Sequence, residues 1–221
     1  MENYTIDQIK AICKVSSRRV GIPFIDARLA EYATKYNGDY PYYDALRGLT
    51  QALKPSIVVE IGTWEGTSGA CFAAGHPGAT VITIDHHSDP GDDANQRKTV
   101  EACGEFENLL YIQGCSTEMV ASLKPASRCV FGDIKEYLNG RTIDFLMVDG
   151  WHHEVMARAD FDTYLPLMSK NGLVICDDIY GASGETLTNM MDFWNGLPGE
   201  KYLDPVIHSV YSMGFVKLGD A

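Results

Sequence analysis

Short apolar runs alternate with longer amphipathic segments along most of the chain. Each run is a continuous stretch of Val, Ile and Leu, which is typical of strands buried on both faces of a parallel sheet. The predicted strands cover residues 56–61, 80–85, 109–112, 143–148 and 172–176. The helices predicted after them cover residues 66–75, 92–103, 116–123, 154–168 and 184–195, and residues 124–142 have room for a further short helix. This alternation predicts a doubly wound α/β sheet.

The C-terminal part of the pattern differs from the rest. Two apolar segments, 202–208 and 210–217, follow each other with almost no connection between them. Such close succession requires a hairpin, so one of the two strands must run antiparallel to the others. The expected fold is therefore α/β, a Rossmann-like doubly wound sheet that is mostly parallel and has an antiparallel C-terminal hairpin at its edge.

An N-terminal helical extension is predicted before the first strand. It contains a helix over 5–15 capped by Thr5, a helix over 26–36 capped by Asp26, and a third that opens at Pro41. We expect residues 1–54 to form this extension, acting as a lid or as the contact of a homo-oligomer. Residues 55–221 are expected to form the main, ligand-binding domain.

The charge of the chain restricts the class of partner. Its 18 Lys and Arg residues stand against 30 Asp and Glu residues, giving a formal net charge of −12. A surface of this sign repels nucleic acid and anionic membranes. The sequence also shows neither an apolar run as long as a membrane span nor the layout of a secretion signal. The six cysteines form no CxxC pair, which predicts reduced thiols. We therefore expect a cytoplasmic protein that acts on a small molecule.

The strand at 56–61 runs directly into a glycine-marked turn, within the stretch VVEIGTWEGTSGA. A nucleotide P-loop requires a lysine after its last glycine, and this turn has none. A dinucleotide-binding turn requires a second glycine where Trp64 stands, and Glu65 beside it would repel a phosphate. The turn is therefore predicted to hold a ligand that bears no phosphate. A tight turn without any ligand is the alternative.

The pattern that remains is E-x-G-x-x-x-G, formed by Glu60, Gly62 and Gly66. Asp85 ends the second strand, where a carboxylate can accept hydrogen bonds from both hydroxyls of a ribose. Adenosine without phosphate, joined to a small amino-acid tail, is the description of S-adenosylmethionine. This cofactor is therefore the ligand that the turn favours.

Three aspartates end two later strands. Asp149 follows the strand at 143–148, and Asp177 and Asp178 follow the strand at 172–176. The strand–helix–strand spacing brings all three to one edge of the sheet, where carboxylates repel one another unless a cation intervenes. Ligands that are all oxygen favour Mg²⁺ or another hard divalent cation. The three aspartates are therefore predicted metal ligands; the alternative is that each only caps a turn or a helix.

With these motifs, the chain resembles the class I S-adenosylmethionine-dependent methyltransferases over residues 42–218. The resemblance implies a position for the cofactor across the ends of the first four strands. Its methionine end would contact Glu60, Gly62, Gly66 and Ser68, its ribose Asp85, and its adenine Cys115 and Ser116, while Asp149 would serve both cofactor and metal and His86 or Trp64 would cover a cofactor face.

The second motif is similar to that of the metal-dependent O-methyltransferases. In the catechol type, D-x-W-K precedes a D-N pair, whereas this chain has D-G-W-H at 149–152 and then Asp177-Asp178. Histidine thus replaces lysine, which is closer to the type that modifies sugars and macrolides. The resemblance implies that His152 is the catalytic base, since imidazole takes up a proton near neutral pH. His153 is expected to be exposed or supporting.

The expected function is Mg²⁺-dependent transfer of a methyl group from S-adenosylmethionine to a hydroxyl of a small molecule, such as a sugar, a natural product or a vicinal diol. A metal-independent small-molecule methyltransferase is the first alternative, and a non-catalytic cofactor-binding module is another. A metallohydrolase would leave the glycine turn unexplained and lacks a spaced H-x-x-x-H pair. Its ligands would come from His86, His87, Asp149, His152, His153 and Asp177.

Overall fold

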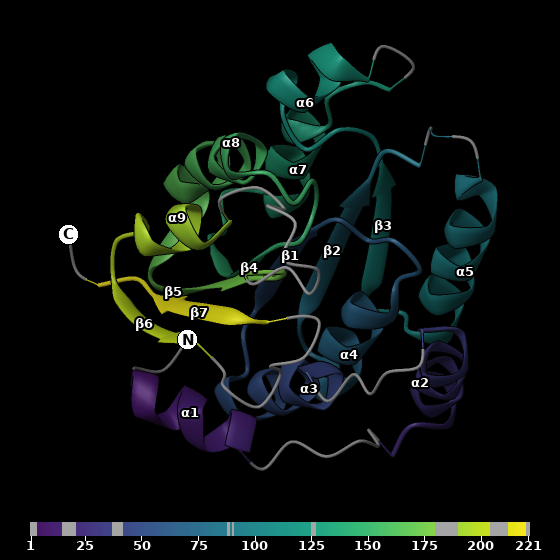
Figure 1. Cartoon of the computed structure of the whole chain (residues 1–221), viewed down its shortest axis with the longest axis horizontal. Coiled ribbons are helices and arrows are strands. Elements are labelled where there is room, and N and C mark those ends of the chain that lie inside the picture. Colours follow the sequence, from purple (N-terminus) through teal and green to yellow (C-terminus); the bar gives the residue numbers. More distant parts are fainter. Residues whose placement is uncertain are drawn as a thin grey trace.

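The computed structural model describes residues 4–14, 21–36, 42–87, 89, 91–124, 127–179, 190–203 and 212–219. Strands from this part of the chain form one sheet with helices on both faces (Figure 1). The strands are β1 (Ile57–Ile61), β2 (Thr80–Asp85), β3 (Leu109–Gln113), β4 (Ile143–Val148), β5 (Met168–Cys176), β6 (Glu200–Leu203) and β7 (Gly214–Lys217). The helices are α1 (Ile6–Lys14), α2 (Pro23–Tyr36), α3 (Tyr42–Leu53), α4 (Thr67–Gly75), α5 (Asp92–Glu105), α6 (Glu118–Leu123), α7 (Phe131–Leu138), α8 (Glu154–Tyr164) and α9 (Met190–Asn195), with a short 3-10 turn η1 (Leu165–Leu167).

The strands lie in the order β3-β2-β1-β4-β5-β7-β6. Strands β1 to β5 pair in parallel, and β7 lies antiparallel between β5 and β6. This confirms the predicted Rossmann-like sheet with an antiparallel C-terminal hairpin. The chain reverses its direction of winding between β1 and β4, and open α/β sheets bind ligands at such a switch point.

The predicted elements differ from the observed ones mainly at their ends. The helix expected over 154–168 stops at Tyr164, because Pro166 in η1 cannot continue a helical hydrogen-bond ladder, and β5 already begins at Met168. The short helix expected within 124–142 is α7. Segments of the predicted hairpin strands and of the helix at 184–195 lie outside the described residues, as does Pro41.

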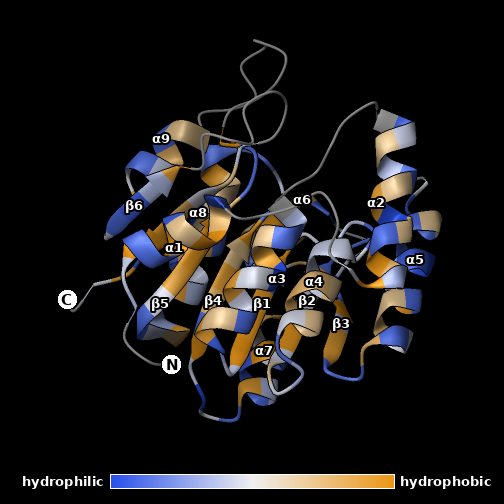
Figure 2. Cartoon of the chain, turned by 90° about the horizontal axis from the view of Figure 1, so that it is seen from below, coloured by the Kyte–Doolittle hydropathy of each residue, from blue (hydrophilic) through white to orange (hydrophobic). Residues whose placement is uncertain are grey.

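Two apolar cores hold the helices to the sheet, one on each face. Side chains alternate along β1, so Val58 packs in one core while Ile57 and Val59 pack in the other. The first core contains buried residues of α1 to α4, and the second contains those of α7, α8 and α9. Figure 2 shows the apolar strands running between helices whose outer faces are more polar.

The three N-terminal helices are built into the first core. Ile9 of α1, Tyr32 of α2 and Leu46 of α3 are fully buried in the same cluster as Val58 of β1. The second helix begins at Pro23, earlier than predicted, and Asp26 accepts a hydrogen bond from the Gly21 amide instead of starting the helix. The boundary at residue 54 and the role of these helices as a lid or an oligomer contact stay predictions.

None of the helices in the described part of the chain is long and apolar enough to cross a membrane.

Candidate active site

A cavity of about 490 Å³ lies at the carboxyl ends of β1 to β5. Its wall combines apolar side chains of the strand ends with polar residues of the loops that follow. The lining residues are Tyr43, Ile61, Gly62, Thr63, Trp64, Thr67, Ser68, Ile84, Asp85, His86, Asp89, Gly114, Cys115, Ser116, Val120, Lys124, Asp149, Gly150, Trp151, His152, Asp160, Asp177 and Asp178. Most of the predicted site residues therefore surround one space.

The glycine turn after β1 is shaped by close backbone approaches. Gly62 has a φ of 92°, and a Cβ at this position would lie 1.9 Å from the Asp149 carbonyl oxygen. Gly66 has a φ of 79°, and its Cβ would lie 3.1 Å from Cα of Thr99 on α5. Gly62 thus lines the cavity and lets β1 approach the end of β4. Gly66 is not among the residues that line the cavity and lies where α4 packs on α5, so its contact with the methionine end stays a prediction.

Asp85 fixes the same turn from the neighbouring strand. Its Oδ2 accepts hydrogen bonds from the Thr63 and Trp64 amides at 3.0 and 2.9 Å. Its Oδ1 accepts one from the His87 amide at 3.2 Å. Oδ2 thus accepts two hydrogen bonds, whereas Oδ1 accepts one and keeps a lone pair, so the side chain can still accept from a ribose hydroxyl while it holds the turn. Sequence spacing predicted the position of Asp85 but not this structural task.

Glu60 lies behind the cavity wall. The residue is fully buried, and its Oε2 accepts a hydrogen bond from the Thr83 hydroxyl at 2.5 Å. Burial raises the pKa of Glu60 to about 8, against hydrogen bonds from Ser68 and Thr83 that lower it. Of the two residues predicted at the methionine end here, Ser68 lines the cavity and Glu60 supports it from behind.

The loop after β3 also lines the cavity. Cys115 and Ser116 line it as predicted, and both are buried. The Ser116 hydroxyl donates to Oδ1 of Asp160 at 2.6 Å, and the Tyr164 hydroxyl donates to the Ser116 carbonyl at 3.1 Å. Asp160 was missed in the sequence because one acid within an amphipathic helix resembles a surface residue.

The acidic group at the ends of β4 and β5 is organised by His152. Its Nε2 lies 3.0 Å from Oδ1 of Asp149, and its Nδ1 lies 2.9 Å from Oδ2 of Asp178. Burial opposes protonation, but the hydrogen bonds and the negative charges of Asp149 and Asp178 together outweigh it and raise the pKa of His152 to about 11. The ring is therefore a cation at neutral pH that bridges two carboxylates. The charged ring holds the two carboxylates together in this arrangement, and the role of His152 as catalytic base stays a prediction.

The carboxylates of Asp149, Asp177 and Asp178 lie close together, which disfavours the charged forms of Asp149 and Asp177. Burial raises the pKa of Asp149, and burial together with the charges of Asp149 and Asp178 raises that of Asp177 well above its usual range. Oδ1 of Asp177 and Oδ1 of Asp178 are buried and have no hydrogen-bond partner in the described part of the chain. Orphaned, mutually repelling carboxylate oxygens are suited to a hard cation.

The predicted metal ligands are nevertheless not drawn into a tight cluster. Among the described residues, the one group of three whose donor atoms all lie within 4.8 Å of one another is His86, Asp89 and Asp92. Asp149 and Asp178 are instead separated by the His152 ring. Asp89 already pairs with Lys124, so the charge of the other cluster is partly compensated.

Two of the histidines predicted for the alternative metallohydrolase make other hydrogen bonds. His87 is buried, with Nδ1 2.7 Å from the Tyr111 hydroxyl and Nε2 2.9 Å from the Trp64 carbonyl. His153 caps α8, because its Nδ1 accepts a hydrogen bond from the Val155 amide at 3.2 Å. Both ring nitrogens of His87 and Nδ1 of His153 are thus engaged away from the Asp149 carboxylate, which argues against the hydrolase.

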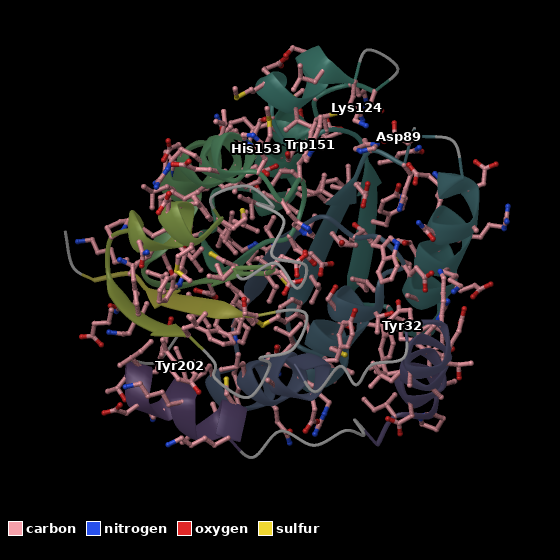
Figure 3. All side chains as sticks on the ribbon, viewed as in Figure 1. Tyr32, Asp89, Lys124, Trp151, His153 and Tyr202 are labelled. Atoms are coloured by element: carbon pink, nitrogen blue, oxygen red, sulfur yellow. The ribbon has the colours of Figure 1, made fainter. Side chains whose placement is uncertain are left out.

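Residues outside the predicted set complete the wall. Tyr43 of α3 lines the cavity, and Tyr32 of α2 stacks on Trp64 with ring centroids 5.3 Å apart. At the other end, Lys124 lies over the Trp151 ring at 5.3 Å and pairs with Asp89 (Figure 3). The sequence could not show which aromatic residues before residue 54 line a site and which only pack in the core.

Strand order, cavity position and the acids at the strand ends define the class I methyltransferase fold. A family model described as a methyltransferase domain matches residues 59–179, more than half of the 221 residues. The chain therefore belongs to this methyltransferase family, which confirms the family resemblance inferred from its motifs.

Solved structures of similar fold agree with this class. The SAH-bound methyltransferase PaMTH1 from Podospora anserina is 18% identical, with a TM-score of 0.63 and coverage of 100% of this chain and 99% of that one. An O-methyltransferase from Bacillus cereus in complex with SAH is 14% identical, with a TM-score of 0.60 and coverage of 96% and 97%. The O-methyltransferase TomG from Streptomyces achromogenes, in complex with SAM, is 13% identical, with a TM-score of 0.60 and coverage of 96% of both chains.

A curated relative extends beyond this domain. The uncharacterized protein y4gI of Sinorhizobium fredii is 27% identical over 135 residues, which are 59% of this chain. The match covers only 14% of that protein, so the chain spans about a seventh of its length.

Proposed function

We propose that this protein is a Mg²⁺-dependent O-methyltransferase, which moves a methyl group from S-adenosylmethionine to a hydroxyl of a small molecule. The observation that carries the proposal is the joining of two features in one cavity. The glycine turn and Asp85 line it after β1 and β2, and the Asp149–His152–Asp178 group lines it after β4 and β5. The family match and the SAH- or SAM-bound neighbours of similar fold support the choice of cofactor.

The cofactor would lie across the ends of β1 to β4. Ser68 would bind the methionine end, Asp85 the ribose hydroxyls, and the loop of Cys115 and Ser116 the adenine. The Trp64 ring, supported by Tyr32, would cover the ligand near α2. Ser68, Asp85, Cys115 and Ser116 all line the one cavity, which supports a single elongated ligand across the strand ends.

A divalent cation would be held by Asp149, Asp177 and Asp178. Bound there, Mg²⁺ would lower the pKa of the acceptor hydroxyl and fix its position. The orphaned oxygens of Asp177 and Asp178 and the raised pKa values of Asp149 and Asp177 support a cation at this point. An acceptor with two neighbouring oxygens suits such a site, because both can bind the same ion.

His152 would take the proton of the acceptor. In this structure its ring nitrogens lie beside Asp149 and Asp178. A cation held by these carboxylates would compete for their oxygens and would free the ring for this task. The chain must then supply only orientation and a proton acceptor, because the sulfonium methyl of the cofactor is already electrophilic.

The second candidate is a metal-independent methyltransferase. One observation favours it: the charged His152 ring already compensates part of the negative charge of Asp149 and Asp178 in the arrangement described here. The two candidates differ in whether the carboxylates need another cation during the reaction.

Removal of metal separates these candidates. Transfer of labelled methyl from S-adenosylmethionine to a panel of vicinal diols, sugars and phenols should stop in EDTA and return with Mg²⁺. Asp177→Asn should need more Mg²⁺ for half-maximal rate, since it removes one negative ligand. Full activity in EDTA with any acceptor would contradict the metal requirement and favour the metal-independent methyltransferase.

A further inference from the structure

Asp160 is a buried acid that the proposed reaction does not use. It lies in α8, its exposed fraction is 1%, and it lines the cavity near the loop after β3. Burial raises its pKa to about 7, partly offset by the hydrogen bond from Ser116. Charged groups are costly inside proteins unless they are paired, so a single hydrogen bond leaves this carboxylate poorly compensated.

The side chain is held in one orientation. Its Oδ1 accepts from the Ser116 hydroxyl at 2.6 Å, while Tyr164 of the same helix anchors the Ser116 carbonyl at 3.1 Å. Its Oδ2 accepts no hydrogen bond from the described part of the chain and lies beside Gly150, 3.6 Å from where a Cβ on that glycine would stand. The loop after β4 lacks a side chain at this point, so Oδ2 keeps its access to the cavity.

The surroundings of Oδ2 restrict the ligand. Ile84, Cys115 and Val120 line the same cavity and offer apolar surface to a flat ring. Above its pKa of about 7 this carboxylate is ionised and only accepts hydrogen bonds, so it then favours an N–H donor and repels a carbonyl oxygen or a phosphate. An aromatic ring with an exocyclic amino group satisfies both conditions.

We propose that Asp160 is a specificity-determining residue that accepts a hydrogen bond from the amino group of the adenine base. The inference rests on the proposed function for the identity of the ligand. It adds that recognition of the base comes from helix α8 through the Ser116–Asp160 pair, and not only from the loops at the strand ends.

A role confined to holding the loop is the competing explanation. In that case Asp160 would act only through Ser116, and removal of either side chain would have the same effect. Ser116→Ala is therefore a matched control, because it breaks the Ser116–Asp160 hydrogen bond and keeps the carboxylate. Asp160→Leu breaks the same hydrogen bond and removes the acceptor.

Calorimetric titration with two ligands distinguishes these roles. The ligands are S-adenosylhomocysteine and its 6-deamino analogue, in which hydrogen replaces the amino group of the purine. The wild-type protein should bind the amino form about 10- to 100-fold more tightly, the usual range for a hydrogen bond to a charged group. Ser116→Ala should keep most of this preference, and Asp160→Leu should reduce it to within about threefold. Asp160→Asn, which retains a neutral acceptor of the same shape, should show an intermediate preference.

The outcomes separate this inference from the proposed function. If the wild-type protein binds neither ligand, the cofactor assignment itself fails. Equal binding of both ligands by the wild-type protein would overturn the role of Asp160 and leave the cofactor in place, whether or not the variants fold. If Ser116→Ala and Asp160→Leu lose the preference for the amino form equally, the proposal is overturned and Asp160 only supports the loop.

Discussion

The His152→Ala variant should transfer methyl groups roughly 10²- to 10⁴-fold more slowly than the wild-type protein at saturating Mg²⁺, the usual span for loss of a general base. The ring touches Asp149 and Asp178, so its removal takes the proton acceptor from the metal end of the cavity. The turn at residues 62–64 is held by Asp85 and is left intact. Affinity for S-adenosylhomocysteine should therefore stay nearly unchanged. Initial rates and calorimetry on the same preparations measure both quantities.

His153→Ala is the matched control for this loss. The two histidines are adjacent, but His153 caps α8 and makes no contact with the Asp149 carboxylate in the described structure. Its removal should cost about 1 kcal/mol of stability through the lost cap and should change the rate little. Equal rate losses in both variants would indicate damage to the turn at 149–155. An unchanged rate in His152→Ala would contradict its role as base.

Gly62→Ala should be the most destabilising single substitution in the glycine turn. A methyl group at this position would meet the Asp149 carbonyl oxygen at 1.9 Å, and that oxygen belongs to backbone, which cannot rotate away. Separating the ends of β1 and β4, together with the left-handed φ, would cost roughly 2–5 kcal/mol of unfolding free energy. Because Asp149 would move with its backbone, binding of both cofactor and cation should suffer. Denaturant titration and calorimetry report the two effects.

Gly91→Ala controls for the backbone conformation. Gly91 has a similar φ of 99°, and nothing in the described chain lies within 4 Å of the position of its Cβ. It should lose only the roughly 1–2 kcal/mol of a left-handed conformation. If both variants lose the same amount, the close approach of Gly62 to Asp149 is not what makes the glycine necessary. From the sequence alone the space beside Gly62 was assigned to the ligand, whereas the structure gives it to the end of β4.

The fold could be predicted because the period of the apolar pattern is a local property. Continuous Val, Ile and Leu runs indicated the five parallel strands, and the short spacing near the C-terminus required the hairpin. Asp85, Asp149 and Asp177 could be placed for the same reason, since carboxyl ends of parallel strands meet at one edge. Helix ends were less accurate where a 3-10 turn, as at Pro166, joins two elements.

The remaining features depend on contacts between distant segments. Gly66 belongs to the packing of α4 against α5, which no spacing within its own turn reveals. The charge of His152 depends on Asp178, which lies in a different loop and has to be placed before the pKa can be judged. Asp160 and Tyr43 are site residues only because their helices lie over the cavity.

Titration of S-adenosylhomocysteine into the wild-type protein in EDTA tests the central claim most directly. The cavity along the ends of β1 to β4 should bind one molecule of the ligand per chain. Its affinity should be the same after addition of Mg²⁺, because the proposed cation lies among Asp149, Asp177 and Asp178 and away from the glycine turn and Asp85. The absence of binding heat both with and without Mg²⁺, at protein concentrations well above the micromolar range, would contradict the assignment of this cavity to the cofactor.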